Sequence, residues 1–439
     1  MTSTLLPEHR VPEGSTLPGQ RPAPGPRPAR DIWAGASPTE NRTPPTLFGR
    51  ARLTGLDAAR GLALIGMVAV HTLPSESAVT ETPTLAFSLF GGRAAALFAV
   101  LAGVSLALMT GRSTPHTGGR WWRSAASLTI RAALIFTLGL ALNNVDLPVY
   151  NILPYYGLLF LLAIPFTRLG AVWNLALGGL MVFLGPVLIH LINSATDFRV
   201  VSLPTFHEVA TTPADVALSL VANGTYPALS WIAFFLVGLG LGRLPLDTVR
   251  TQANILLAGG VLALVGPVLS GLLLNGGNRW SRIAAQDGTM TVTDVVDIDM
   301  FGPADDLPLP TSSWWWLAVD GPHTNTPLAL VSGIGFALLA VGSFLLVART
   351  VEGLLTPLIS VGSMTLTLYT AHLLFLSVVD TAAVPSLWLL LQLFAAAVFA
   401  TAWLATLGRG PLEAVVYRLA RLPLGSGRPR RRAGKHAVV

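Results

Sequence analysis

The sequence contains no cysteine, and only 11% of its 439 residues are charged. The missing thiols exclude disulfide bridges, thiolate metal sites and a cysteine nucleophile. A soluble domain would carry about 25% charged residues, so this low charge, together with 52% hydrophobic residues, indicates a membrane protein. The net charge of +6 comes from arginines gathered in alternate loops. We therefore assign it to membrane topology and expect no nucleic-acid partner.

Apolar stretches long enough to cross a bilayer recur along the chain. They cover ten segments: 55–74, 87–109, 124–143, 149–167, 171–193, 226–243, 253–274, 327–348, 359–379 and 385–407. Part of 208–225 could insert as an eleventh. Arginine fills one set of alternating loops and acidic residues the other, which predicts both termini in the cytoplasm. We therefore predict an all-α, polytopic transmembrane helical bundle of ten or eleven helices in the plasma membrane.

Two tails and two long outer loops flank these spans. Residues 1–48 are rich in proline and arginine and predict a disordered cytoplasmic tail. Residues 49–410 form the membrane domain, with outer loops near 194–225 and 275–326, and residues 411–439 predict a basic cytoplasmic tail. The second loop is acidic and ends in Trp314–Trp316. This cluster either anchors the chain at the lipid interface or stacks on a sugar.

The first span carries three ionisable residues, Asp57, Arg60 and His71. Such residues in a membrane helix usually face the bundle interior or a watery cavity. His71 follows Arg60 by eleven positions, so both fall on one helix face, about 16 Å apart along the axis. We predict an Asp57–Arg60 ion pair. His71 suits general-base catalysis, and Arg60 suits a phosphate-bearing donor.

Further polar residues lie at the outer ends of other spans. His372 lies at a depth comparable with His71 and shares a polar stripe with Tyr369. His372 is a second candidate base, and Arg93 and Tyr369 are candidates for binding an acceptor or stabilising an oxyanion. Three more residues are candidates for the acceptor entrance: Tyr155, Tyr156 and His323.

On the cytoplasmic side, arginines gather beside two tryptophans. The group consists of Arg112, Arg120, Arg123 and Arg131, with Trp121 and Trp122. The group either enforces topology or binds a nucleotide diphosphate such as coenzyme A through charge and stacking. No spacing typical of metal ligands is present, so we expect no metal.

Several motifs resemble known membrane acyltransferases. Arg60, ten residues and His71 match the first helix of acyltransferase family 3. LDAARGLALIGM resembles the opening of heparan-α-glucosaminide N-acetyltransferase-like proteins and their YeiB-like relatives, as do LFAVLAGVSLAL, ILPYYGLLFLLAIP, YPALSWIAFFLVGLGLGR and MTLTLYTAHLLF. The lysosomal members place their histidine in the loop after the first helix. Here residues 72–84 contain none, so His71 follows family 3.

The resemblance implies a cytoplasmic acyl-CoA donor, such as acetyl-CoA, and a carbohydrate or glycolipid acceptor on the outer side. It makes His71 the base and Arg60 a donor-side partner. We therefore predict an acyl-CoA-dependent O- or N-acyltransferase in contact with membrane lipid; a homo-oligomer is left open. A proton-coupled transporter is one alternative, although no inverted repeat is visible. A noncatalytic membrane scaffold is the other.

Overall fold

A computed structural model describes residues 53–422, apart from 197–198 and 305–306. Within this part the chain is helical, and the only β-pairing is an isolated bridge between Glu76 and Pro83. The predicted N-terminal tail, 1–48, and residues 423–439 lie outside the described residues. Residues 411–420, which the sequence assigns to the second tail, form a helix that packs against α4 (Gly118–Leu142) and α15 (Thr365–Leu376).

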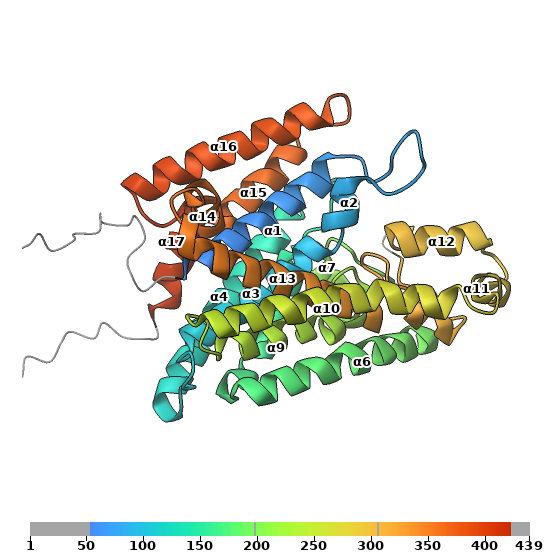
Figure 1. Ribbon diagram of the computed structural model, residues 1–439, viewed down its shortest axis with the longest axis horizontal. Coiled ribbons are helices and arrows are strands. Elements are labelled where there is room, and N and C mark those ends of the chain that lie inside the picture. Colours follow the sequence, from blue (N-terminus) through green and yellow to red (C-terminus); the bar gives the residue numbers. More distant parts are fainter. Residues whose placement is uncertain (1–52, 197–198, 305–306, 423–439) are drawn as a thin grey trace, which may run out of the picture. The chain divides into compact units, whose positions relative to one another are not determined.

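The helices alternate in direction between two ends of the bundle (Figure 1). The first half of the bundle contains α1 (Thr54–Thr72), α2 (Leu85–Phe90), α3 (Arg93–Met109), α4 (Gly118–Leu142), α5 (Leu153–Ala163), η1 (Pro165–Arg168), α6 (Ala171–Ala195), α7 (Phe206–Thr211), α8 (Pro213–Leu218), the π-helical turn η2 (Ser219–Asn223) and α9 (Ala228–Gly242). The second half contains α10 (Val249–Leu274), α11 (Arg279–Asp287), α12 (Val292–Phe301), η4 (Trp314–Ala318), α13 (Pro327–Val351), α14 (Thr356–Ser363), α15 (Thr365–Leu376), α16 (Pro385–Thr406) and α17 (Pro411–Ala420). Following the predicted orientation, we name the end with α17 the inner end and the end with α11 and α12 the outer end.

Six described helices are long and apolar enough to cross a membrane, and two bent helix pairs raise the number to eight. The eleven-residue α5 and the charge-bearing α1 are not among them. The all-helical, multi-pass character is thus confirmed, whereas the count of ten or eleven crossings and the side of the termini stay predictions. Residues 213–223, where an eleventh span was considered, form a segment bent by 53° from α9.

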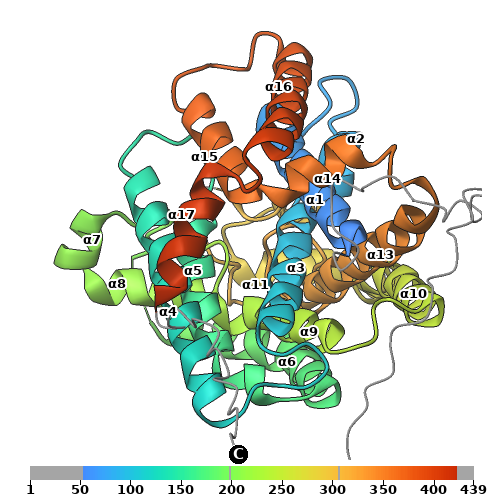
Figure 2. The same cartoon turned by 90° about the vertical axis from the view of Figure 1, so that its left-hand side faces the viewer.

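Small residues bring the central helices close together. Helices α1, α3, α9 and α13 are largely buried, whereas only 6% of the apolar window of α16 is buried. Figure 2 views the bundle from the inner end, with α3 near the middle and α6, α10 and α16 toward the edge. At the α3–α9 contact, a Cβ on Gly103 or Gly238 would overlap the facing backbone. Close backbone packing of this kind is typical of membrane bundles.

Candidate functional site

Two histidines from distant parts of the chain meet at the outer end of the bundle. His71 lies in the last turn of α1, and His372 lies in α15. The His71 Nδ1 and His372 Nε2 atoms are 3.1 Å apart, and the two rings are nearly parallel, at 7°. Gln392 of α16 continues the chain of hydrogen bonds, because its Oε1 lies 2.7 Å from His372 Nδ1. The structure therefore brings both candidate bases together.

Gln392 determines which ring nitrogens carry protons. Its amide nitrogen donates to the Thr72 hydroxyl at 3.3 Å, so its oxygen faces His372. An amide oxygen only accepts, so His372 Nδ1 carries a proton and donates it. In a neutral His372 the Nε2 lone pair then accepts from His71 Nδ1–H. His71 is left with a free lone pair on Nε2, the form that a general base requires.

His71 lines a cavity of about 690 Å³ between α1 and the outer loops, which we call the outer cavity. This volume is typical of a small-molecule binding site. Its polar lining includes His71, Tyr150, Asn223, Tyr226, His323 and Asn325. Of the candidates for the acceptor entrance, His323 lines this cavity, and Tyr155 lies behind it with its ring 5.5 Å from that of Tyr226.

Arg60 lines a separate cavity of about 240 Å³ toward the inner end, which we call the inner cavity. The predicted ion pair with Asp57 is present, and a second guanidinium nitrogen donates to Ser105 at 3.0 Å. Arg131 lines the same cavity, and its buried Nε has no hydrogen-bond partner in the described structure. A cavity of this size is below the usual range for ligand pockets and suits a narrow chain rather than a nucleotide. Two guanidinium groups fit the polar or anionic part of such a chain.

A thin layer separates the inner from the outer cavity. The inner lining ends at Met67, Ile152 and Tyr369, and the described residues that line one cavity do not line the other. Met67 lies four residues before His71, so the layer is about one helical turn, or roughly 6 Å, thick along α1. Arg60 and His71 therefore line two separate cavities within the described residues. The Tyr369 hydroxyl accepts from the Ile152 amide at 3.4 Å and so links two residues of this layer.

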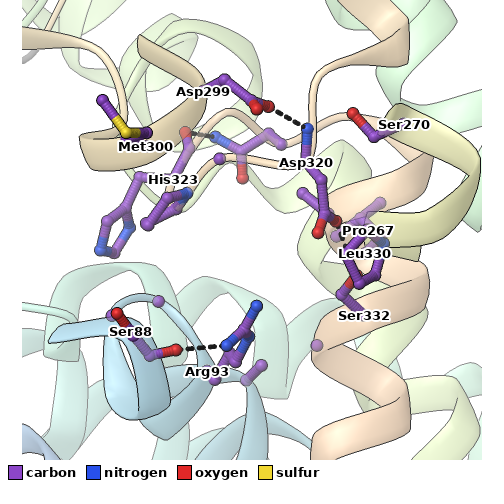
Figure 3. Close-up of a pocket in the computed structure, with 18 of the residues that line it drawn as sticks. Ser88, Arg93, Pro267, Ser270, Asp299, Met300, Asp320, His323, Leu330 and Ser332 are labelled. Atoms are coloured by element: carbon purple, nitrogen blue, oxygen red, sulfur yellow. Dashed lines mark hydrogen bonds between the residues drawn. The ribbon is translucent and has the colours of Figure 1, made fainter. Parts of the chain in front are cut away.

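Beside the outer cavity lies a third cavity of about 410 Å³, which we call the side cavity. Arg93 enters it from α3, and Asp299 and Asp320 enter it from the outer loop (Figure 3). Asp299 accepts a hydrogen bond from the Asp320 amide at 2.9 Å, and Asp320 accepts one from the Ser332 hydroxyl at 2.6 Å. Arg93 thus lies with two carboxylates, and it is not among the residues that line the outer cavity with His71.

Burial shifts the pKa of three groups in this region. Burial raises the pKa of Asp320 to about 6, against the opposing effects of the Ser332 hydrogen bond and the nearby Arg93 guanidinium. Burial also raises the pKa of Asp299 and lowers that of His323 to about 4. His323 is therefore neutral at pH 7, and the region carries its charge on Arg93 and the two carboxylates.

The remaining candidate residues are dispersed. Tyr156 lines the inner cavity and donates to the Ala95 carbonyl at 3.0 Å. Arg112 lies 3.5 Å from Asp247, whereas Arg120 and Arg123 are exposed at the start of α4. Of the four arginines of the predicted cytoplasmic group, Arg131 alone lines the inner cavity.

The aromatic clusters also have partners within the protein. The ring of Trp121 lies 3.5 Å from the Arg168 guanidinium, so one of its faces is occupied. In the outer loop, Trp316 is fully buried in a small core, and Trp314 packs on His190 with ring centroids 4.3 Å apart. Trp316 therefore stabilises the outer loop from within.

Comparison with known proteins identifies the family that this chain resembles. Residues 52–268 match the family model described as heparan-alpha-glucosaminide N-acetyltransferase, catalytic. The predicted resemblance to these membrane acyltransferases is confirmed. The matched region contains Arg60, His71 and Arg93, whereas His372, Gln392 and the side-cavity carboxylates follow it in the chain. No curated protein matches the sequence significantly.

Several residues that line or support these cavities were not predicted from the sequence. Gln392 is an amide within an apolar stretch, LLLQLF, which is the signal that could have found it. Asp299 and Asp320 were counted only as acidic loop residues. Glu413 lines the inner cavity and accepts hydrogen bonds from both the amide and the hydroxyl of Thr367. Within residues 53–422, no group of three or more His, Asp or Glu side chains could hold a metal ion.

Proposed function

We propose that this protein is a membrane acetyltransferase that uses an acyl-CoA donor and acylates a carbohydrate acceptor in the outer cavity. The observation that carries the proposal is the His71–His372–Gln392 chain, because it leaves a basic nitrogen on a residue that lines the outer cavity. The similarity of residues 52–268 to the heparan-α-glucosaminide N-acetyltransferase family supports acetyl transfer as the reaction.

In the proposed reaction the acceptor amine or hydroxyl attacks the thioester carbonyl carbon. His71 Nε2 takes the acceptor proton as the new C–N or C–O bond forms. The tetrahedral intermediate then collapses, the C–S bond breaks, and the coenzyme A thiolate takes up a proton. His372 is a positioning residue in this scheme, because its Nε2 holds the Nδ1 proton of His71 and stabilises the imidazolium that forms.

The donor approaches from the inner end in this proposal. Arg60 and Arg131 contact the pantetheine arm in the inner cavity, while the nucleotide stays on the cytoplasmic side among the exposed arginines. For the thioester to reach His71, the layer at Met67, Ile152 and Tyr369 has to open. In this proposal the Tyr369 side chain rotates away from the Ile152 amide and opens part of this layer.

The test is transfer of radiolabelled acetyl groups from acetyl-CoA to glucosamine by the purified protein in lipid nanodiscs. His71→Ala is expected to lower kcat by at least about 100-fold, the usual contribution of a general base. His207→Ala is the matched control, because His207 is an exposed histidine of α7 that lines none of the three cavities. Equal rates for His71→Ala and wild type would refute the proposed base. Proton-coupled uptake of glucosamine into proteoliposomes without any acyl donor would favour the transporter instead.

A further inference from the structure

The side cavity adjoins the outer cavity, and the two share one wall. This wall contains Phe87, Gly91, Gly92, His323 and Asn325, which line both cavities. Gly92 has a φ of +65° and lies against Pro322 and His323, so a Cβ there would be strained and would contact both. Two of these five residues lack side chains, so the two cavities come close together at Gly91 and Gly92. A ligand longer than one cavity is therefore able to lie across this wall.

The segment that forms the other side of this wall is held in a strained conformation. His323 and Asn325 both have a φ of +58°, which is unusual for residues with a Cβ. Trp231 Nε1 donates to Asn325 Oδ1 at 2.7 Å, and Asn325 Nδ2 donates to the Thr225 carbonyl at 3.3 Å. Strained residues that the surrounding structure fixes in this way cluster at ligand-binding sites.

Several polar groups of the side cavity have hydrogen-bonding capacity that no described residue satisfies. Within the described residues Asp299 and Asp320 each accept one hydrogen bond, although a carboxylate accepts several. His323 Nδ1 is buried and has no partner within the described residues. Arg93 uses one guanidinium nitrogen on the Ser88 carbonyl and forms no ion pair within 4 Å in this part of the chain. Buried polar groups with such spare capacity are costly unless water or a ligand satisfies them.

The mixture of groups defines the ligand that fits. Two carboxylates disfavour a phosphate, and the neighbouring Arg93 guanidinium disfavours a metal ion. A neutral polyol suits both, because its hydroxyl groups donate to carboxylates and accept from a guanidinium. Trp231 and Trp280 also line this cavity and add aromatic surface. A sugar ring has this combination of hydroxyl groups and apolar C–H faces.

We infer that the side cavity is a second sugar-binding subsite, in which Arg93, Asp299 and Asp320 hold the neutral sugar next to the one that is acetylated. The inference rests on the proposed function, since it places the reacting sugar in the outer cavity. It makes the acceptor an oligosaccharide or glycan of at least two units. The second unit adds affinity without touching His71.

The test compares methyl α-glucosaminide with the disaccharide α-glucosaminyl-(1→4)-glucose, using the full chain in lipid nanodiscs. Both Kd, measured by calorimetry without an acyl donor, and KM for acetyl transfer are determined. We expect the disaccharide to have values about 10-fold lower or more, the effect of one or two hydrogen bonds to charged groups. Asp320→Asn and Arg93→Met should each bring the ratio of the two ligands close to one.

The matched control is Asp297→Asn, since Asp297 is an exposed carboxylate on α12, two residues from Asp299. It should preserve the preference for the disaccharide. Equal affinities for the two ligands in wild type, or a preference that survives both Asp320→Asn and Arg93→Met, would overturn the inference. Failure of the proposed function appears differently, as absence of acetyl transfer to either ligand. In that case the calorimetric ratio still decides whether the subsite exists, and absence of binding by both ligands overturns it.

Discussion

Replacing Asp320 by asparagine should stabilise the protein at neutral pH, even though it removes a proposed sugar ligand. The carboxylate is half-buried beside Asp299, and the Arg93 guanidinium offsets only part of the cost of its charge. Asparagine has nearly the same shape and carries no charge. It also keeps an oxygen that accepts from the Ser332 hydroxyl.

The magnitude follows from the pKa of Asp320, which burial raises from 3.8 to about 6. A difference of one in pKa corresponds to about 1.4 kcal/mol, so the charged form costs up to about 3 kcal/mol at pH 7.5. Since the side chain is partly exposed and the asparagine amide also loses water, we expect a net gain of about 1–2 kcal/mol.

The sign of the pH dependence is fixed by the direction of this shift. A carboxyl group whose folded-state pKa is raised contributes stability at low pH, and this contribution is lost as the pH rises through about 6. At pH 4.5 only about one third of the full effect is present, so the unfolding temperatures of wild type and Asp320→Asn should differ less than at pH 7.5. The difference should develop between pH 4 and pH 6 and stay constant above pH 7.

Thermal unfolding followed by tryptophan fluorescence measures this effect in one detergent at pH 4.5 and pH 7.5. The chain has 11 tryptophans, whereas thiol-reactive dyes have no target because there is no cysteine. Asp297→Asn should leave the unfolding temperature unchanged at both pH values, because that side chain is exposed. Destabilisation by Asp320→Asn at pH 7.5, or the same offset at both pH values, would refute the reasoning.

Three further substitutions test other parts of the structure. Gln392→Leu should lower kcat about 10- to 100-fold with KM unchanged, because His372 loses the partner that orients it. Gln392→Glu still accepts that hydrogen bond and should retain most activity. Steady-state kinetics of both variants test this role of Gln392. Arg60→Met should raise KM for acetyl-CoA about 10-fold and leave KM for the acceptor unchanged, so a change confined to the acceptor would contradict a donor-side role. Gly238→Ala should destabilise the bundle by about 1–3 kcal/mol, because its methyl group meets a backbone carbonyl of α3. At Gly179 a methyl group would meet open space, so Gly179→Ala is the control. The yield of monodisperse protein on size exclusion should fall only for Gly238→Ala.

Much of the helical framework could be predicted from hydrophobic segments alone. The apolar stretches coincide with helices because backbone groups in a membrane must be satisfied within each segment. Local spacing also predicted the Asp57–Arg60 pair, since residues three apart share one side of a helix. The similar depth of His71 and His372 in their spans suggested a relation between them. The structure adds the direct contact of their rings.

The hydrogen-bond chain and the cavities could not be predicted, because they depend on contacts between segments that are distant in the sequence. His71 and His372 are 301 residues apart, and Gln392 reaches them from a third helix, so no local pattern encodes the direction of their hydrogen bonds. The division into inner and outer cavities depends on where Tyr369 packs, which the helical period does not specify. The side cavity forms from loop residues whose backbone conformation was not predictable from hydropathy.

The closed layer at Met67, Ile152 and Tyr369 has a consequence for proton leakage across the membrane. A permanently hydrated path past two histidines would conduct protons and dissipate the electrochemical gradient across the membrane. With this layer closed, the protein is able to hold polar groups at both ends without such a proton path. Dye-reported acidification of sealed vesicles that contain the protein measures whether this layer blocks proton flow.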